Sequence, residues 1–442
     1  MGAPPDADAP TGSRFETVLS IVAASLALVS SVGFLNAFGV FQDYYEENEL
    51  RDSSASDISW IGSASIFFLF ALSPVAGILS DRIGSRILVI FGSIFQLLAV
   101  FMTSLCGEYY QFFLAQAVLL GVSMSFVTWP AVASVSRRTP KRRGLALGIV
   151  IAGSSVGGVI WPVALQKLLF VHRIGFPWTM RTVGFIMMAI LIVVCIGTSD
   201  PARTPTPAPD VEQQQRATET SQEESVYDGK KSNDGNAQQK NRGGGKAEDE
   251  KLFTNPNFLL LCAAYALGYF GLFVPFFYVS IYASDVGVSS ELSFYLISIV
   301  NGASFFGRIA PGHLADSLGH FNMAALAMML SAIIAFTWTA ATSAAGLIVW
   351  SLAYGFASGA ILSLQGACAG KMASRAAQGR AIGGLTGSLA ITALVGTPIG
   401  GQIATNYGFL PLSMYAGATL MAGAVTILFA RLRIHRGVWV AY

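Results

Sequence analysis

The sequence reads Gly77-Ile78-Leu79-Ser80-Asp81-Arg82-Ile83-Gly84 at the end of one apolar stretch, and Gly312-His313-Leu314-Ala315-Asp316-Ser317-Leu318-Gly319 at the end of another. Both segments have the spacing Gly-x-x-x-Asp-x-x-Gly, at an interval of 235 residues, and each lies between two hydrophobic segments. Internal repeats of this length in an apolar sequence are typical of duplicated membrane transport proteins. The repeat therefore predicts two structurally related halves.

Composition places most of the chain in lipid. Of the 442 residues, 53% are hydrophobic and only 12% are charged, about half the charged fraction of a soluble domain. The net charge is +2, and we find no basic tract with interleaved aromatic residues, so we expect no nucleic-acid partner. The four cysteines and four histidines have no metal-binding or disulfide spacing, and we expect neither a metal nor a cofactor.

Twelve apolar runs are long enough to cross a bilayer, which takes about 20 residues in a helix. We place the spans near 17–41, 58–79, 87–106, 110–135, 143–170, 179–198, 256–283, 291–313, 320–342, 345–370, 378–404 and 411–430. The predicted fold is an all-α membrane protein of twelve transmembrane helices in two pseudo-symmetric six-helix bundles, 17–198 and 256–430.

The remaining segments are polar. The segment 199–255 is rich in Pro, Gln, Ser, Glu and Lys, so it lacks the apolar residues of a core and we expect a disordered linker. Lys and Arg concentrate in the loops that share its side of the membrane, and this bias predicts that the linker, the N-terminal 1–16 and the tail 431–442 face the cytosol. We expect a multi-pass protein of the plasma membrane.

The halves also match where spans 5 and 11 begin, at Arg143-Gly144-Leu145-Ala146 and Gly379-Arg380-Ala381-Ile382. With these landmarks the chain resembles the major facilitator superfamily. The segments Ser31–Phe41 and Arg137–Gly158 look more narrowly like the fungal branch of the monocarboxylate porter family. The resemblance implies two bundles around a central cavity, alternating access and transport driven by a gradient.

The chain departs from that family at informative positions. Members that move lactate-like acids with protons typically have a Lys in span 1 and an Asp–Arg pair in span 8. Here Arg308 occupies the Arg position, but Ser304 stands where the Asp would be and span 1 carries Asn36. These departures argue against simple proton–lactate symport.

Arg308 is the sharpest candidate for substrate binding, because a charge inside a span is costly unless it faces a cavity or a partner. The alternative is that its side chain snorkels to the cytosolic surface. Asn301, Ser304 and Arg308 share one helix face. Further pocket candidates, which could equally face lipid or the core, are Asn36, Tyr265, Tyr269, Gln365, Gln116 and Trp129.

A second group of residues is predicted to latch the halves together at the cytosolic side. It comprises Asp81, Arg82, Arg86, Arg142 and Asp316. The alternative is that these residues only cap helices and set topology. Spans 5 and 11 each carry a face of small residues that permits close helix approach; these are Gly144, Gly148, Gly153, Gly157 and Gly158, and Gly383, Gly384, Gly387, Gly396, Gly400 and Gly401.

The function that fits these observations is secondary active transport of a small organic acid or amphipathic metabolite, with export favoured. Uptake of a monocarboxylate or vitamin-like nutrient and a non-transporting membrane sensor are the alternatives. The letters Gly153-Ser154-Ser155-Val156-Gly157 match a nucleophile elbow, but they lie in an apolar helix, so we expect no enzyme. The expected partners are a small-molecule substrate and the lipid bilayer, and we expect a monomer.

Overall fold

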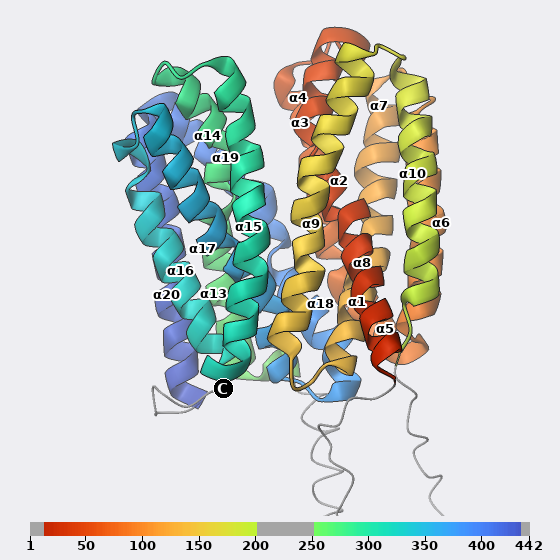
Figure 1. Cartoon of the computed structure of the whole chain (residues 1–442), viewed down its shortest axis with the longest axis vertical. Helices are drawn as coiled ribbons and strands as arrows, with labels where there is room; N and C mark the ends of the chain where they lie inside the picture. The colour runs from red at the N-terminus through yellow and green to blue at the C-terminus, as the bar shows by residue number, and fades with distance from the viewer. Residues whose placement is uncertain (1–12, 201–251, 435–442) are drawn as a thin grey trace, which may run out of the picture.

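The computed structural model describes residues 13–200 and 252–434, in which every element is helical (Figure 1). The first half consists of α1 (Arg14–Ser30), α2 (Val32–Leu35), α3 (Phe38–Tyr44), η1 (Tyr45–Glu49), α4 (Ala55–Ala71), α5 (Ser73–Ile83), α6 (Ser85–Thr103), α7 (Tyr109–Phe112), η2 (Phe113–Leu119), α8 (Leu120–Arg138), α9 (Arg143–Gln166), η3 (Lys167–Val171) and α10 (Phe176–Gly197). The second half consists of η5 (Leu252–Thr254), α13 (Pro256–Leu272), α14 (Val274–Asp285), α15 (Ser290–Leu318), α16 (His320–Phe336), η6 (Trp338–Ala340), α17 (Ala344–Lys371), η7 (Arg375–Ala377), α18 (Gln378–Ser388), α19 (Ala390–Tyr407) and α20 (Phe409–Ile434).

The predicted transmembrane fold is confirmed. Eleven helical segments are long and apolar enough to cross a membrane, and α16 is a shorter apolar helix of 17 residues at the position of the ninth span. The predicted disorder of the linker falls largely on residues outside the described ranges. At the linker's two described edges, Asp200 bonds to Arg137 and Leu252 is buried.

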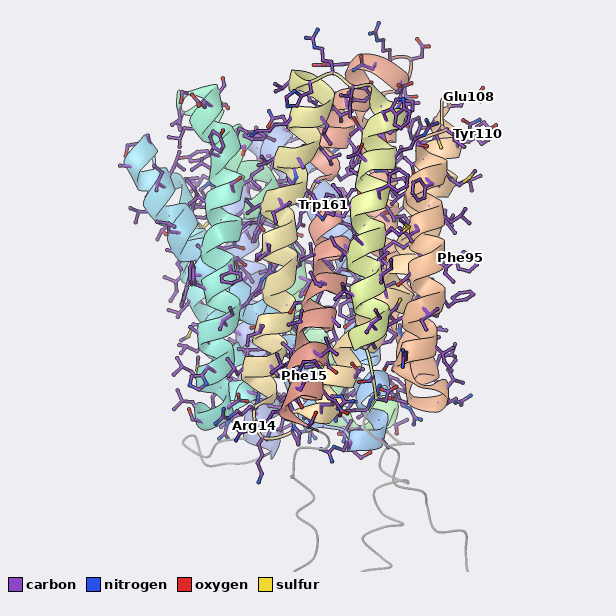
Figure 2. The ribbon with its side chains drawn as sticks, turned by 45° about the vertical axis from the view of Figure 1, so that its right-hand side comes forward. Arg14, Phe15, Phe95, Glu108, Tyr110 and Trp161 are labelled. Atoms are coloured by element: carbon purple, nitrogen blue, oxygen red, sulfur yellow. The ribbon has the colours of Figure 1, made fainter. Side chains whose placement is uncertain are left out.

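Both halves begin and end on the same side of the molecule (Figure 1). We call this side the linker end and the opposite side the far end. Arg14 and Phe15 lie at the linker end, whereas Glu108 and Tyr110 lie at the far end (Figure 2). Many large apolar side chains point outward from the bundles, Phe306 and Ile391 among them at 65% and 67% exposure, as expected for helices surrounded by lipid.

The repeated motif forms the same turn in both halves. Gly84 ends α5 with a φ of 97°, and Gly319 ends α15 with a φ of 94°. A side chain at either position would be strained, because L-residues rarely adopt positive φ. Each turn leads directly into the next helix, so the chain reverses sharply at the linker end and presents the motif aspartate to the other half.

Several spans are broken into two helices rather than continuous. The first span bends at Ser31 and again at Asn36 and Ala37, without any proline. The seventh span breaks at Phe273, two residues before Pro275, where the proline's missing N–H and fixed φ suit a helix start.

The two halves meet along two seams of close backbone contact at the linker end. In one seam α9 packs against α15, and in the other α5 packs against α18. A Cβ atom on Gly144 would lie 2.2 Å from the carbonyl oxygen of Gly312, and one on Gly77 would lie 2.1 Å from that of Gly379. Such contact is possible only without side chains. α9 and α15 lie side by side at the linker end and diverge towards the far end (Figure 1).

A candidate substrate site and two latches

Arg308 reaches across the α9–α15 seam. Its Nη1 donates to the carbonyl oxygen of Ile151 at 2.8 Å and also to the hydroxyl of Ser154. The side chain is 3% exposed, so it does not snorkel to the surface. The structure therefore joins Arg308 of the second half to α9 of the first, a partner that the sequence analysis did not name.

The bonding capacity of Arg308 is only partly used. Its Nε has no hydrogen-bond partner in the described structure, and neither has the buried hydroxyl of Ser304 one turn away. No carboxylate of the described residues pairs with the guanidinium. Burying an isolated cation costs free energy. The unpaired N–H groups of this guanidinium can donate hydrogen bonds to an anionic oxygen group of a ligand.

Asn36 and Asn301 approach each other from the two halves over Gly158. A Cβ atom on Gly158 would lie 2.9 Å from the Asn36 Nδ2 and 3.3 Å from the Asn301 Oδ1. Asn36 sits at the break in the first span and is exposed, as is Gly39 one turn further along. Because α8, α9 and α10 pack around α1, we interpret this exposed face as opening toward the axis between the bundles.

The remaining predicted pocket residues form a buried cluster in the second half. The Tyr269 hydroxyl donates to Gln365 Oε1 at 2.5 Å, and the Tyr265 hydroxyl lies 3.9 Å from the Cys368 sulfur. Tyr269 makes an edge contact across the halves with Phe70, at 6.2 Å between ring centroids. Tyr265 and Tyr269 thus face the protein interior and not lipid.

Gln116 and Trp129, the other two candidates, have partners within the first half. The Tyr45 hydroxyl donates to Gln116 Oε1 at 2.6 Å, and Trp129 Nε1 donates to the carbonyl oxygen of Leu69 at 2.9 Å. Gln116 lies in the π-helical turn η2, towards the far end and away from Arg308. The structure therefore groups Arg308, Asn301, Asn36, Tyr269 and Gln365 near the axis, and separates Gln116 from them.

Asp81, predicted to be part of a latch, joins the first half to the second by capping α18. Its Oδ1 accepts from the backbone N–H of Gly379 at 2.9 Å and its Oδ2 accepts from that of Arg380 at 2.7 Å. Arg137 Nη1 also donates to Oδ1 at 2.9 Å. A carboxylate at a helix N-terminus receives otherwise unpaired amides and complements the helix dipole.

Asp316 makes the equivalent contact in the opposite direction. Its Oδ1 accepts from the backbone N–H of Gly144 at 2.7 Å and its Oδ2 accepts from that of Leu145 at 3.0 Å, at the start of α9. His320 Nε2 lies 3.2 Å from Oδ1. The geometry of its two amide bonds matches that of Asp81.

The basic residues proposed for the latch are placed differently. Arg82, Arg86 and Arg142 are exposed, whereas the arginine that binds Asp81 is Arg137, 7% exposed. Arg137 is itself held by Asp200 at 2.6 Å, just after the sixth span. Arg137 lies one residue before Arg138 in the last turn of α8. This position could have identified it from the sequence, because a buried cation needs a carboxylate partner.

We expect Asp81→Asn to slow transport several-fold without reducing the amount of protein in the membrane. The variant retains one acceptor oxygen but loses the negative charge that Arg137 and the α18 N-terminus stabilise. The α5–α18 seam therefore opens more easily, and the populations of the two conformations of the transport cycle shift. Initial rates in a flux assay measure the effect. Asp316→Asn is the matched variant for the other half, and Asp285→Asn, exposed at the end of α14, is the control. If both Asp81→Asn and Asp316→Asn transport at normal rates, the two aspartates only cap helices and set the topology.

Comparison with known proteins identifies the family of the chain and several similar transporters. The Major Facilitator Superfamily model matches residues 17–345. An MFS-type transporter of Aspergillus fumigatus is 48% identical over 425 residues, covering 95% of this chain and 92% of that protein. The agnestins efflux protein of Paecilomyces divaricatus is 44% identical over 423 residues, covering 96% and 89%.

Among solved structures, the proton:xylose symporter XylE matches with a TM-score of 0.70 at 12% identity, covering 96% of both chains. This likeness shows the shared fold alone. These matches are to transporters and not to enzymes. The Gly153–Gly157 segment accordingly lies inside α9, where the Ser154 hydroxyl donates to the carbonyl oxygen of Ile151 at 3.0 Å.

Proposed function

Because the chain belongs to the major facilitator superfamily, we propose that it exports an anionic, amphipathic metabolite from a fungal cell by alternating access. The observation that carries the anionic character is Arg308, a buried cation with no carboxylate partner and an unpaired Nε. The name of the agnestins efflux protein supports export over the uptake alternative. We infer that Arg308 binds the carboxylate, with Asn301, Ser304, Asn36, Tyr269 and Gln365 around it and Tyr265 packed behind.

We also propose that the chain is related to the monocarboxylate porter family. This relationship rests on Arg308 and on the Arg142-Arg143-Gly144 segment. The chain departs from that family in its coupling. Arg308 does not release its proton, because guanidinium groups stay charged in proteins. Ser304 does not supply a carboxylate either. The transported anion itself is therefore the charge that balances Arg308, and a coupled proton would have to be carried by another group.

Both seams and the central residues lie within one chain, which supports a monomer as the transporting unit. We place this monomer in the plasma membrane, with the linker end in the cytosol. The buried and exposed arginines of the α8–α9 connection support that orientation, since positive residues concentrate on cytosolic loops. The acidic loop after α3, with Glu46, Glu47 and Asp52, then faces outside. Asp81 and Asp316 act as latches that close the cytosolic side.

The orientation predicts which positions a membrane-impermeant thiol reagent reaches in intact cells. In a background with Cys106→Ser, we expect Asp52→Cys to be labelled without permeabilisation, and Lys141→Cys to be labelled only after it. Both side chains are exposed, so access depends on the side of the membrane. Labelling of Lys141→Cys in intact cells would reverse the proposed topology.

The function itself is tested by comparing the metabolites of cells and medium after deletion of the gene. We expect one or more organic acids to accumulate inside the cells and to disappear from the medium. Reintroducing the wild-type gene should restore the export, whereas Arg308→Ala should not. Loss of a neutral metabolite from the medium would refute the anion site, and depletion inside the cells would favour uptake.

A further inference from the structure

The two seams are related by the duplication, and near the linker end they match closely. Gly148 packs against the carbonyl oxygen of Arg308, and its counterpart Gly383 packs against that of Ser73; the Cβ distances would be 2.4 and 2.2 Å. All four residues obey the interval of 235 that relates the motifs. Any difference between the seams therefore shows where the two halves have acquired different tasks.

The match ends one turn further into the membrane. The α9–α15 seam and the adjacent α2 carry the polar side chains Arg308, Ser154, Asn301 and Asn36. At the same interval the α5–α18 seam and its surroundings carry the counterparts Ser73, Leu389, Ile66 and Gly271. Of these four counterparts only Ser73 carries a polar side chain, and its hydroxyl donates to the carbonyl oxygen of Gly383 at 2.9 Å.

The second seam is aromatic where the first is polar. Phe70 lies between Ser73 and Ile66, hence at the depth of the Arg308–Asn301 pair. It makes an edge contact with Tyr269 of the other half and lies 6.0 Å from Trp129 between ring centroids. Rings in such contacts also pack well on a ligand's ring or apolar surface.

The two asparagines at the polar seam have bonding capacity to spare. Asn301 uses its Nδ2 on the carbonyl oxygen of Ile297 at 3.1 Å, and no hydrogen bond to its Oδ1 or to the Asn36 amide occurs within the described residues. They share a space over Gly158 that even a methyl group would obstruct. An amide pair with free donors and acceptors is suited to a neutral hydroxyl or carbonyl group, in contrast to the guanidinium.

We propose, on the basis of the proposed function, that the substrate lies across the axis between the two seams. Its carboxylate binds Arg308, and a hydroxyl or carbonyl group beside the carboxylate binds Asn36 and Asn301. Its aromatic or extended apolar body packs on Phe70 and Tyr269. The substrate class is therefore an amphipathic hydroxy or keto acid, with its charge and its apolar body recognised by different seams.

Four related acids separate these contributions: propionate, lactate, 3-phenylpropionate and 3-phenyllactate. They combine the presence or absence of the hydroxyl with that of the ring, and all keep the carboxylate. Binding to the full-length protein in detergent is measured by calorimetry. We expect 3-phenyllactate to bind most tightly, with the hydroxyl worth roughly 3- to 10-fold and the ring a similar or larger factor.

Two variants should each remove one preference. Asn301→Leu is expected to abolish the advantage of the hydroxyl acids and to leave the advantage of the ring. Phe70→Ala is expected to weaken the two phenyl acids several-fold and to leave propionate and lactate unchanged. The matched controls are Asn406→Leu, exposed near the far end of α19, and Phe306→Ala, 65% exposed on α15; both should bind like the wild type.

The outcomes separate this inference from the function on which it rests. If the acids bind and depend on Arg308, but Asn301→Leu and Phe70→Ala weaken all four equally or not at all, the crosswise orientation is wrong and the anion site stands. If the wild type binds none of the four acids, or binds them equally well with Arg308→Ala, the anion site fails and the orientation fails with it. Thermal unfolding of each variant identifies loss of folding, and Asn301→Ser and Phe70→Leu then replace the failed variants.

Discussion

Arg308→Ala is expected to abolish transport while leaving the protein folded in the membrane. Among the residues that the structure describes, Arg308 is the one buried cation well inside a span, ten residues from the end of α15, whereas Arg137, Arg138, Arg143 and Arg431 lie near the linker ends of their helices. Each charge-assisted hydrogen bond contributes about 1.5–3 kcal/mol, so losing two of them from a bound anion weakens binding at least 100-fold. Flux of the substrate into inside-out vesicles measures the effect.

Two further variants distinguish anion binding from a structural role. Arg308→Lys keeps the charge but loses the planar pair of donors, and we expect weak residual transport. Ser154→Ala removes one contact across the seam and leaves the charge in place, so transport should stay near the wild-type rate. If Ser154→Ala is as damaging as Arg308→Ala, the arginine serves the α9–α15 contact and the substrate binds elsewhere.

Gly148→Ala is expected to hold the protein with its linker end open. The added methyl carbon would lie 2.4 Å from the backbone carbonyl oxygen of Arg308, and backbone cannot move aside as a side chain can. The seam has to separate, which shifts the population toward conformations in which α9 and α15 do not touch at this end. Because the cycle requires both conformations, we expect transport to fall at least tenfold.

Spin labels on Lys141→Cys and Ser317→Cys measure the opening, since both exposed positions lie at the linker end, on different halves. Their separation should increase in Gly148→Ala. Gly302→Ala is the control, because no atom beyond its own stretch of helix lies within 4 Å of the position its Cβ would take. An unchanged separation, together with normal flux in Gly148→Ala, would mean that the seam tolerates local adjustment and is not a gate.

The sequence was sufficient to predict the fold because lipid imposes one strong rule on it. Every backbone polar group must be paired within its own helix, so spans appear as apolar runs whose ends the structure moves by only a few residues. The break in the first span at Ser31 and Asn36 could not be predicted, since no proline or glycine pair marks it. The break adjoins the close packing of Gly33 against Gly157, a contact between residues far apart in the chain.

The candidate site was predicted in its types of residue but not in its partners. An arginine within an apolar span can be recognised from the sequence. Its hydrogen bonds to Ile151 and Ser154 cannot, because they depend on how the two halves pack against each other. Asp81 was grouped with basic side chains, yet it also accepts from the backbone amides of Gly379 and Arg380, which have no signature in the sequence. The glycines of α9 were expected on one face, but Gly144 and Gly148 face α15 while Gly153 and Gly157 face α1.

The unmatched charge of Arg308 has a consequence for the response to membrane voltage. With a monovalent anion bound, the centre of the protein is electrically neutral, so reorientation of the loaded form moves no net charge there. The empty form carries one positive charge through the same movement, and a full elementary charge crossing 100 mV corresponds to about 2.3 kcal/mol. Voltage therefore acts on the return of the empty carrier, and an inside-negative cell holds Arg308 on its cytosolic side, ready for the next anion.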